Sequence, residues 1–308
     1  MPKLSSKNSR QNISHKLYLG VDGGGTSCRV RIENANRDIL GEGFAGPSNS
    51  RLGAVRVYYE IEKACLEALH QSGRGREDFA SLHVGLGLAG LGLESELQAM
   101  LSFPHSFASV SGATDAYTAC LGAHAGEDGG ILILGTGSCG LGIVNDDVIN
   151  VGGWGFEISD HASGAVLGLT AVRSSLFAAE GCRPETPLTK AIMAHFKNDR
   201  QVMVKWAEEA EPHHYGSFAP LIFDHANEGD ELAGRIVAKS VHEAGCMIQA
   251  LLDRGVEAVC LMGGVSKRIA PKLPEKYQKT LSKPRGDAMD GAIRMVRKST
   301  SDNQGVSK

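Results

Sequence analysis

The stretch Leu17-Tyr-Leu-Gly-Val-Asp-Gly-Gly-Gly-Thr-Ser-Cys-Arg-Val-Arg-Ile-Glu33 decides the fold class of this chain. An apolar run, Leu17 to Val21, enters the glycine turn Asp22 to Thr26. Glycines let backbone N–H groups approach an anionic ligand because no Cβ stands in the way, so the turn is a phosphate-loop candidate. After the turn, Val30 and Ile32 alternate with polar residues, which is the period of a strand. We therefore expect the loop to join two antiparallel strands.

The two common nucleotide-binding loops are not supported. Gly-x-Gly-x-x-Gly occurs three times, starting at Gly41, Gly85 and Gly135, but 39 glycines in 308 residues make chance matches expected. A dinucleotide fingerprint also needs a preceding strand, a following helix and an acidic residue about twenty positions on, and none of the three clearly has all of these. No Gly-Lys pair occurs, which excludes a P-loop NTPase.

Length and composition fit an ordinary globular protein of about two domains, with 42% hydrophobic and 22% charged residues. A net charge of −3 without a basic cluster argues against nucleic-acid binding. No apolar run approaches the length of a membrane span. Seven cysteines without a Cys-x-x-Cys pair are expected to be reduced, mostly buried thiols of a cytoplasmic protein. The polar residues 1–15 are expected to be a disordered tail.

A second copy of the strand and glycine-loop device follows. The apolar run Gly130 to Leu134 enters Gly135-Thr-Gly-Ser138, and a strand hairpin comes after it. Gly137-Ser138-Cys139 echoes part of Gly25-Thr26-Ser27-Cys28, which suggests a duplicated domain. Two such loops facing each other across a cleft would hold a triphosphate. The alternative is a pair of tight turns in an unrelated sheet protein, which would rarely need so many glycines.

Periodicity elsewhere predicts an α/β protein. Val55 to His70 has helical spacing and ends near Gly73, a residue suited to a helix C-terminus. Ser81 to Leu88 and Phe107 to Val110 resemble strands.

The later part of the chain is expected to be helical from Gly164 until the short strand Ala258 to Met262. That strand enters Gly263-Gly264. A third glycine turn would suit the nucleoside end of a nucleotide, but a simple strand-to-helix turn is an equal alternative.

Two aspartates are candidates for phosphoryl-transfer chemistry. Asp115 stands at a strand-to-helix junction, where a carboxylate is most often a helix cap. Its position between two phosphate loops makes it our choice for the base that accepts the proton of an attacking hydroxyl. Asp22, at the mouth of the first loop, could bind Mg²⁺ directly or through water, or could be a turn residue.

Polar residues near the glycine turns could hold a sugar. Asn49 is either a turn residue or a donor and acceptor for sugar hydroxyls, and Asp160 could bridge two adjacent hydroxyls. Trp154, in a Gly-Gly-Trp-Gly turn, is expected to pack against the protein.

As a set, these segments resemble the N-acetylglucosamine and glucosamine kinases, which are related to the BadF/BadG/BcrA/BcrD ATPases within the sugar kinase, Hsp70 and actin superfamily. The segments that carry the resemblance are Asp22–Thr26, Ala113–Ala116, Leu134–Ser138, Gly152–Gly155, Ser159-Asp160 and Gly263-Gly264. The resemblance spans roughly Lys16 to Arg297. Phe156 to Asp160 and Ser163 to Gly168 look most like the bacterial glucosamine kinases.

The resemblance implies two RNase H-like (actin-like ATPase) domains with an interdomain cleft. Residues 16–118 plus 286–299 would form the first domain, and residues 119–285 the second, with the second phosphate loop and the adenosine site. Asp115 would be the base for the sugar 6-hydroxyl. The residues implied for Mg-ATP are Gly23, Gly24, Gly25, Thr26, Gly135, Thr136, Gly137, Ser138, Gly263 and Gly264, with Asp22 for the metal. Those implied for the sugar are Asn49, Gly153 and Asp160, and the family also suggests a homodimer.

The expected function is ATP-dependent phosphorylation of glucosamine at its 6-hydroxyl, with N-acetylglucosamine as the alternative substrate. His161-Ala162 follow Asp160 where many relatives carry Glu-Gly, which bears on the choice of sugar. An ATPase activator of a radical dehydratase is the alternative from another class. It would need clustered cysteines for an iron–sulfur cluster, and no paired or closely clustered cysteines lie near a glycine loop. A non-catalytic sugar sensor would not need Asp115 or both loops.

Overall fold

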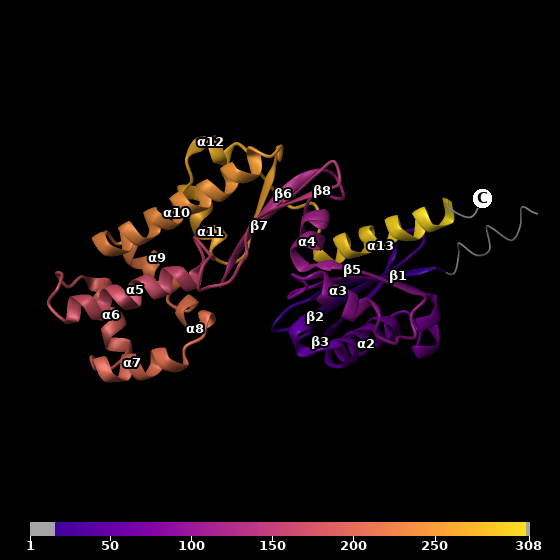
Figure 1. The fold of residues 1–308 in the computed structure, drawn as a ribbon, viewed down its shortest axis with the longest axis horizontal. Coiled ribbons are helices and arrows are strands. Elements are labelled where there is room, and N and C mark those ends of the chain that lie inside the picture. Colours follow the sequence, from indigo (N-terminus) through magenta and orange to yellow (C-terminus); the bar gives the residue numbers. More distant parts are fainter. Residues whose placement is uncertain (1–15, 306–308) are drawn as a thin grey trace, which may run out of the picture. The chain divides into compact units, whose positions relative to one another are not determined.

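The computed structural model describes residues 16–305, which form two α/β units (Figure 1). The first unit combines the chain up to residue 127 with the chain from residue 284, and the second contains residues 128–283. The tail predicted for residues 1–15 lies outside the described residues, and the cleft implied between the domains stays a prediction.

The first boundary between the units differs from the expected one at residues 118 and 119, which falls inside a helix. Helix α4 (Asp115–Ala123) packs along the C-terminal helix α13 (Ala288–Gly305), so it belongs to the first unit. The two helices lie close together because of glycines. A Cβ at Gly122 would overlap the carbonyl oxygen of Asp287, and one at Gly291 would overlap that of Thr118.

The first unit is built on a mixed five-stranded sheet in the order β3-β2-β1-β4-β5. Its strands are β1 (Leu17–Gly23), β2 (Cys28–Asn34), β3 (Ile39–Ala45), β4 (Leu82–Leu88) and β5 (Ser109–Thr114). The β1–β2 pair is antiparallel, as predicted, and β4 and β5 add in parallel beside β1. β5 begins later than the strand predicted at Phe107, whose side chain is buried in the core before the strand starts.

Helices complete the first unit. They are α2 (Ala54–His70), α3 (Glu94–Leu101), α4 and α13, with short 3₁₀ turns at Ser50–Leu52 and Arg76–Ser81. The buried face of α2 packs mainly on β3 and β2, where Gly41 and Gly43 let the helix backbone come close to the sheet. Helix α3, between β4 and β5, was not predicted. The prediction of a helix ending near Gly73 is confirmed, because α2 ends at His70 and Gly73 adopts a φ of 69°.

The second unit repeats the same sheet topology. Its strands are β6 (Gly129–Leu134), β7 (Ser138–Val144), β8 (Asp147–Gly152), β9 (Val259–Met262) and β10 (Leu281–Ser282). Read as β8-β7-β6-β9-β10, their order and directions match β3-β2-β1-β4-β5 of the first unit. This match is what a duplicated domain predicts, and it confirms the α/β class.

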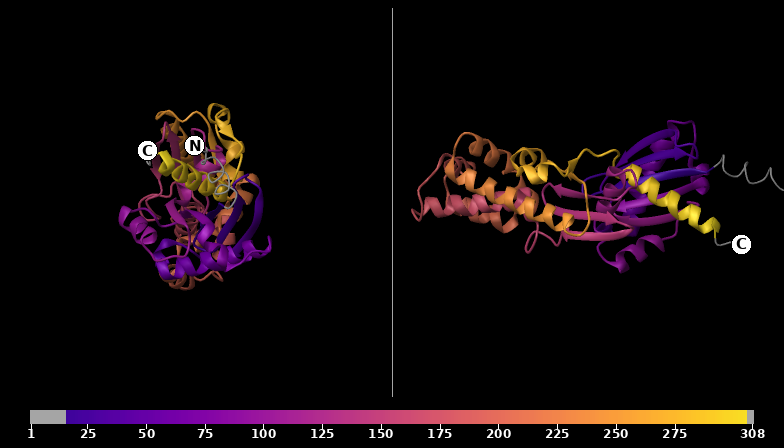
Figure 2. Two further views of the ribbon diagram at one scale, coloured as in Figure 1. Left: turned by 90° about the vertical axis from the view of Figure 1, so that its right-hand side faces the viewer. Right: turned by 90° about the horizontal axis from the view of Figure 1, so that it is seen from above.

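Most of the second unit is helical, as expected. The helices are α5 (Gly164–Ala179), α6 (Pro187–His195), α7 (Arg200–Glu209), α8 (Pro212–Gly216), α9 (Ala219–Asn227), α10 (Glu231–Leu252), α11 (Ser266–Ile269) and α12 (Glu275–Gln278), with a 3₁₀ turn at Ala270–Lys272. Figure 2 shows these helices, coloured from pink to orange, gathered in one part of the unit. They share one core with strands β6 and β9, and this core includes an aromatic cluster around Phe196, Trp206 and Phe218.

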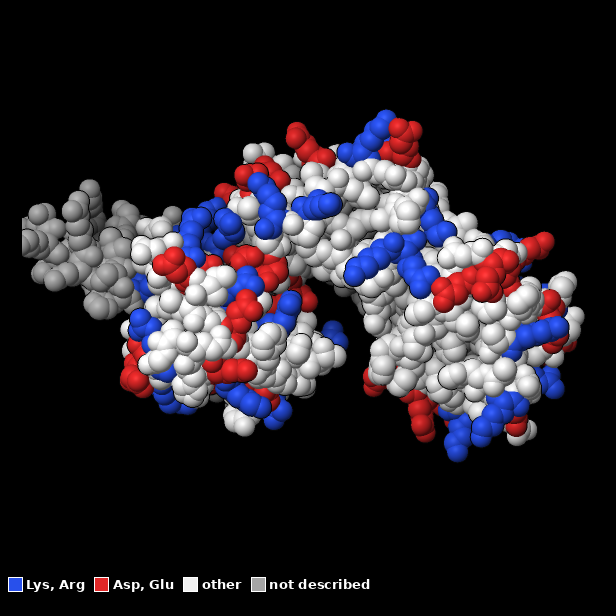
Figure 3. Space-filling model, turned by 180° about the vertical axis from the view of Figure 1, so that it is seen from behind, with Lys and Arg blue, Asp and Glu red and all other residues white. Residues whose placement is uncertain are grey.

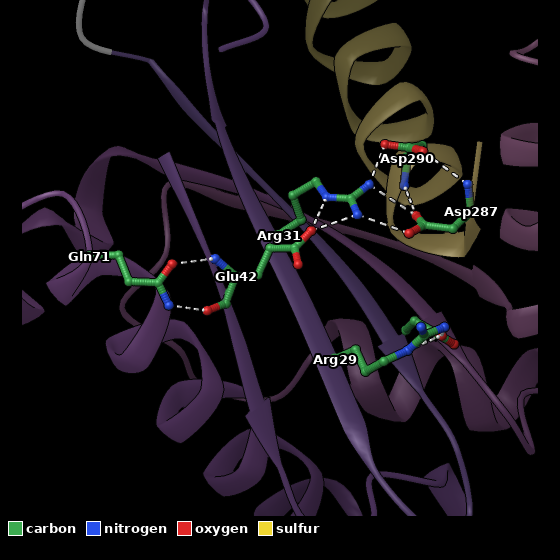
Figure 4. A network of polar contacts seen from close by, with 7 residues as sticks. Arg29, Arg31, Glu42, Gln71, Asp287 and Asp290 are labelled. Atoms are coloured by element: carbon green, nitrogen blue, oxygen red, sulfur yellow. Dashed lines mark hydrogen bonds and ion pairs between the residues drawn. The ribbon is translucent and has the colours of Figure 1, made fainter. Parts of the chain in front are cut away.

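In the first unit, Arg31 of β2 ties the edge strand to the C-terminal helix (Figure 4). Its guanidinium pairs with Glu42 at 2.6 Å, with Asp287 at 2.9 Å and with Asp290 at 2.5 Å. The side chain is 12% exposed, so three carboxylates surround one largely buried cation. This network holds the returning chain onto the first sheet.

Side chains of α2 and of Gln71, the residue directly after it, form hydrogen bonds with the outer backbone groups of the edge strand β3. The Gln71 amide donates to the carbonyl of Glu42 and accepts from its N–H (Figure 4), and a Glu67 carboxylate oxygen accepts from the Phe44 N–H at 2.7 Å. The N–H and carbonyl of Glu42 and the N–H of Phe44 therefore have partners within the chain.

On the face seen in Figure 3, acidic and basic side chains are interspersed on both units. All seven cysteines are free thiols, and four of them are buried. None of the helices among the described residues is both long enough and apolar enough to span a membrane.

Candidate active site

The first glycine loop joins β1 to β2. Gly24 N–H donates to the Ser27 carbonyl at 2.9 Å and closes the turn, while Gly25 and Thr26 are exposed. No protein atom lies within 4 Å of where a Cβ of Gly25 would stand. The loop therefore presents bare backbone to an open space, as a phosphate loop requires.

Asp22 lies at the root of this loop and is paired with Arg29. The two residues stand opposite each other in the antiparallel register of β1 and β2, and the guanidinium donates to the carboxylate. The Asp22 side chain is 19% exposed and that of Arg29 is 43% exposed. The pair places one anion and one cation beside the loop that would bind charged phosphates.

The segment that contains Asn49 is fastened to the same loop. Ser48 N–H donates to the Gly24 carbonyl at 3.0 Å, and Ser50 N–H donates to the Ala89 carbonyl at 3.0 Å. The Asn49 side-chain oxygen accepts from Arg51 N–H and caps the short 3₁₀ turn. The turn role considered for Asn49 is thus present in the structure, and the segment lies next to the first glycine loop.

Asp115 is the first residue of α4 and is not its cap. The capping residue is Thr114, whose hydroxyl accepts from Tyr117 N–H at 3.2 Å. An Asp115 carboxylate oxygen accepts from the neighbouring Ala116 N–H at 2.9 Å. Burial raises the pKa of Asp115 above its ordinary value, and the negative charge of Asp22 raises it further. A carboxylate with a raised pKa is a better proton acceptor than an exposed aspartate.

The second glycine loop joins β6 to β7 and contacts Asp160. Gly135 N–H donates to the Gly137 carbonyl at 2.9 Å, and Ser138 N–H donates to the Asp160 carboxylate at 3.2 Å. The Asp160 side chain lies against Gly137, close enough that a Cβ there would be crowded. Burial raises the pKa of Asp160 as well. The residue expected to hold the sugar therefore also supports the second loop.

The segment from Gly152 to Ala162 is unusual in its backbone. Positive φ angles occur at Gly152, Gly153, Gly155, Asp160 and Ala162. Non-glycine residues adopt this conformation only when the surroundings impose it, and such positions gather at ligand sites. The segment is therefore a candidate binding loop of the second unit.

The expectation that Trp154 packs against the protein is wrong, because its side chain is 74% exposed. Gly153 and Gly155 have φ angles of 79° and 98°, so the chain turns sharply on both sides of the indole. The apolar core is reached instead by Phe156, which stacks on Tyr215 at 5.7 Å.

A cavity of about 350 Å³ opens beside the second loop, wholly within the second unit. It is lined by Gly135, Thr136, Gly164, Gly216, Ala219, Pro220, Phe223, Gly264, Val265 and Arg268. Gly263 has a φ of 89°, and a Cβ there would overlap the Leu134 carbonyl oxygen. The third glycine turn thus packs directly on the end of β6, and Gly264 faces the cavity.

The family profile of the BadF/BadG/BcrA/BcrD ATPases matches residues 19–293. The chain belongs to this ATPase family. It is 43% identical over 276 residues to the glucosamine kinase GspK of Vibrio cholerae. The aligned residues cover 90% of this chain and 94% of the relative. The family prediction is confirmed.

Solved structures agree with this assignment. A Chromobacterium violaceum protein, named as a candidate N-acetylglucosamine kinase, superposes with a TM-score of 0.83 and 31% identity over 91% of this chain and 99% of its own. A ROK family glucokinase from Streptomyces griseus shares the fold, with a TM-score of 0.53 and 15% identity over 92% of this chain and 99% of its own. These likenesses confirm the predicted sugar kinase and actin-like ATPase fold.

The residues of α8, α9 and α11 that line the cavity of this ATPase were missed by sequence reasoning. They are Gly216, Ala219, Pro220, Phe223 and Arg268. No glycine loop or motif marks them, because they approach the second loop through the packing of helices far apart in sequence. The one local signal is the segment Gly216-Ser-Phe-Ala-Pro220 between α8 and α9, in which every residue but Phe218 is small or a proline.

Among the described residues, no group of three or more His, Cys, Asp or Glu side chains is arranged to hold a metal ion. Mg²⁺ in kinases needs no such cage, since it keeps several waters and is bound by one or two carboxylates together with substrate phosphates. Asp22, a partly exposed carboxylate at the root of the first loop, fits that kind of site.

Proposed function

We propose that this chain transfers the γ-phosphoryl group of ATP to the 6-hydroxyl of glucosamine, giving glucosamine 6-phosphate and ADP. The observation that carries the proposal is the position of Asp115, a carboxylate with a raised pKa beside an open glycine loop and a second carboxylate. The 43% identity to a protein named as a glucosamine kinase supports the choice of sugar.

In this proposal the first unit performs the proton and phosphoryl chemistry. Asp115 accepts the proton of the 6-hydroxyl as its oxygen attacks the γ-phosphorus. The Gly24 N–H closes the turn on the Ser27 carbonyl, so the donors to the oxygens of the transferred group are the Gly25 N–H and the Thr26 N–H and hydroxyl. Mg²⁺ held by Asp22 would neutralise part of the phosphate charge. Arg29, paired with Asp22, keeps that carboxylate oriented toward the loop.

The second unit binds the nucleotide. The N–H groups of Thr136 and Gly137 and the Thr136 hydroxyl donate to its phosphates, and the cavity beside Gly263 and Gly264 holds the nucleoside. Gly135 and Ser138 shape the loop through their bonds to the Gly137 carbonyl and to Asp160. No protein atom lies within 4 Å of a Cβ position on Gly135 or Gly264, so both glycines leave room that a larger residue would fill. This fits a nucleotide that lies close to the backbone.

The sugar would be held by Asn49, Gly153 and Asp160. Because the oxygen of Asn49 already accepts from Arg51, its part would be to donate through Nδ2. The negative charge of Glu157 acts on Asp160, whereas Glu243, which accepts from the Ala162 N–H at 3.1 Å, is paired with Lys239 at 3.6 Å. A negative environment favours the ammonium of glucosamine over an acetamide.

N-Acetylglucosamine is the second candidate substrate, because the 31% identical structural neighbour is named for it. A homodimer, suggested by the family, is also part of the proposal and is tested by light scattering on the purified chain.

The experiment is coupled ADP release with Mg-ATP against glucosamine, N-acetylglucosamine and glucose, compared by kcat/KM. A preference for glucosamine supports the proposal, and a preference for N-acetylglucosamine supports the second candidate. Turnover that no sugar stimulates overturns both. The Asp115→Asn protein serves as the background control, since it keeps the fold of the loop but lacks the base.

A further inference from the structure

Arg268 and Phe223, two residues that line the proposed nucleoside cavity, form a cation–π pair. Arg268, on the short helix α11, has its guanidinium carbon 5.9 Å from the centroid of the Phe223 ring on α9. Its Nη1 donates to Asp224 at 2.7 Å. Phe223 is 1% exposed, whereas the Arg268 side chain is 43% exposed. The ring belongs to the core, and the partly exposed Arg268 lines the cavity beside it.

The rest of the cavity is suited to a flat, weakly polar group. Among its lining side chains only those of Thr136 and Arg268 carry hydrogen-bonding atoms, and the others are apolar or belong to glycine. Thr136 belongs to the phosphate loop, so Arg268 is the polar side chain left for the nucleoside part. Apolar walls with few polar groups are typical of pockets that hold an aromatic ring.

The Asp224 contact decides how Arg268 can bind. Guanidinium donors lie in the plane of the group, and the two faces of that plane are free to stack. Asp224 occupies part of the donor edge and neutralises the charge, which makes a second anion such as a phosphate a poorer partner. The pair itself is exposed, and exposed ion pairs contribute little to folding stability. Its effect is to orient the plane.

We propose that Arg268 determines nucleotide affinity by stacking its guanidinium plane on the nucleobase, with Asp224 as the residue that orients it. The inference rests on the proposed function, because it assumes that the cavity takes the nucleoside of ATP. It adds the contact that recognises the base and predicts that this contact is made by a plane, not by a point charge.

The test is isothermal titration of the full chain with ADP, adenosine and inorganic pyrophosphate. Arg268→Ala should weaken binding of ADP and adenosine by about 3- to 30-fold, the range expected for loss of a cation–π or stacking contact. Pyrophosphate binding should not change. Arg268→Lys keeps the charge but lacks the plane, so it should resemble Arg268→Ala. Asp224→Asn should have a smaller effect of the same sign.

Weaker pyrophosphate binding in Arg268→Ala, or full rescue by Arg268→Lys, would show a phosphate contact and overturn the inference. Unchanged ADP affinity in Arg268→Ala would overturn it as well. Thermal unfolding without ligand shows whether each variant keeps its fold. If the wild-type chain binds ADP but no sugar stimulates turnover, the proposed function fails while the Arg268 comparison still gives its answer.

Discussion

The two units share one strand order but carry different chemistry at the same loop. In the first unit, the turn after β1 is bordered by charged groups, namely Asp22, Arg29 and Asp115. In the second, the corresponding turn after β6 opens on a cavity lined mainly by glycines and apolar side chains. A duplicated scaffold thus supplies two backbone loops, and the residues attached around each loop give it a separate role.

The difference arises in the connections between strands. From β3 to β4 the first unit inserts one long helix, α2, with two short 3₁₀ turns. From β8 to β9 the second unit inserts the helices α5 to α10. Those extra helices bring Gly216, Ala219 and Phe223 to the second loop and form walls that the first loop does not have. The insertion therefore supplies walls of the cavity that we propose holds the nucleoside.

The largest expected effect comes from removing the base of the first unit. Asp115→Asn should lower kcat by about two to four orders of magnitude, because the hydroxyl proton loses its acceptor. ADP affinity should not change, since the nucleoside cavity lies in the second unit. Coupled ADP release and calorimetry measure the two quantities. Asp253→Asn, at the exposed end of α10, is the matched control. Near-normal turnover in Asp115→Asn would remove this residue from the mechanism.

The second largest effect should come from a substitution that disturbs the packing of the third glycine turn. Gly263→Ala places a Cβ at a φ of 89° and against the Leu134 carbonyl, so it should destabilise the protein by about 2 kcal/mol or more in urea unfolding. Gly264→Ala is the neighbouring control, because no protein atom lies within 4 Å of its Cβ position. Equal stability of the two variants would contradict the packing described for the third glycine turn.

Asp160→Asn should separate sugar binding from catalysis. Asparagine tolerates the φ of 57° found here and its oxygen still accepts from Ser138 N–H, so the change isolates the charge. We expect the KM for glucosamine to rise by about tenfold, as loss of charge-assisted hydrogen bonds predicts, with a smaller change in kcat. If the KM for ATP rises while that for glucosamine stays constant, Asp160 serves the second loop and not the sugar.

The smallest effect concerns pH. Asp115 works as a base when deprotonated, and its raised pKa means that kcat/KM should fall, as the pH is lowered, at a higher pH than for an ordinary aspartate. Arg29→Gln leaves the charge of Asp22 uncompensated beside Asp115. This should raise the pKa of Asp115 further and move the acid limb upward by as much as about one unit. Arg51→Gln, on the nearby 3₁₀ turn, should not move it. A downward shift in Arg29→Gln would contradict the charge arrangement.

Sequence alone predicted the parts of the fold that depend on local pattern. Two antiparallel strand pairs were predicted from the apolar runs before Asp22 and Gly135 and from the period-two stretches after them. The shared topology was predicted because this strand and glycine-loop pattern occurs twice. Local glycine content also predicted the three turns. The pairing of Asp22 with Arg29 was not predicted, although it follows from antiparallel register once the two strands are known.

The remaining features depend on long-range packing. Helix α4 joins the first unit because α13 returns to it from the far end of the chain, which no local signal at residue 118 reveals. The exposure of Trp154 depends on the left-handed glycines beside it, and a tryptophan in isolation is expected to be buried. The walls of the nucleoside cavity come from helices that have no motif.

The side chains that cover β3 have a consequence for the protein in concentrated solution. An open sheet edge is a template for sheet extension and aggregation, and Ile39 and Phe44 on this strand are largely exposed. To add a strand here, another chain would first have to displace Glu67 and Gln71 from the backbone groups that they already bind. Replacing both by alanine should leave the fold intact but make the protein prone to fibre formation. We therefore expect Glu67 and Gln71 to hinder self-association through this strand, and fibre formation by the double variant, followed by thioflavin fluorescence, measures it.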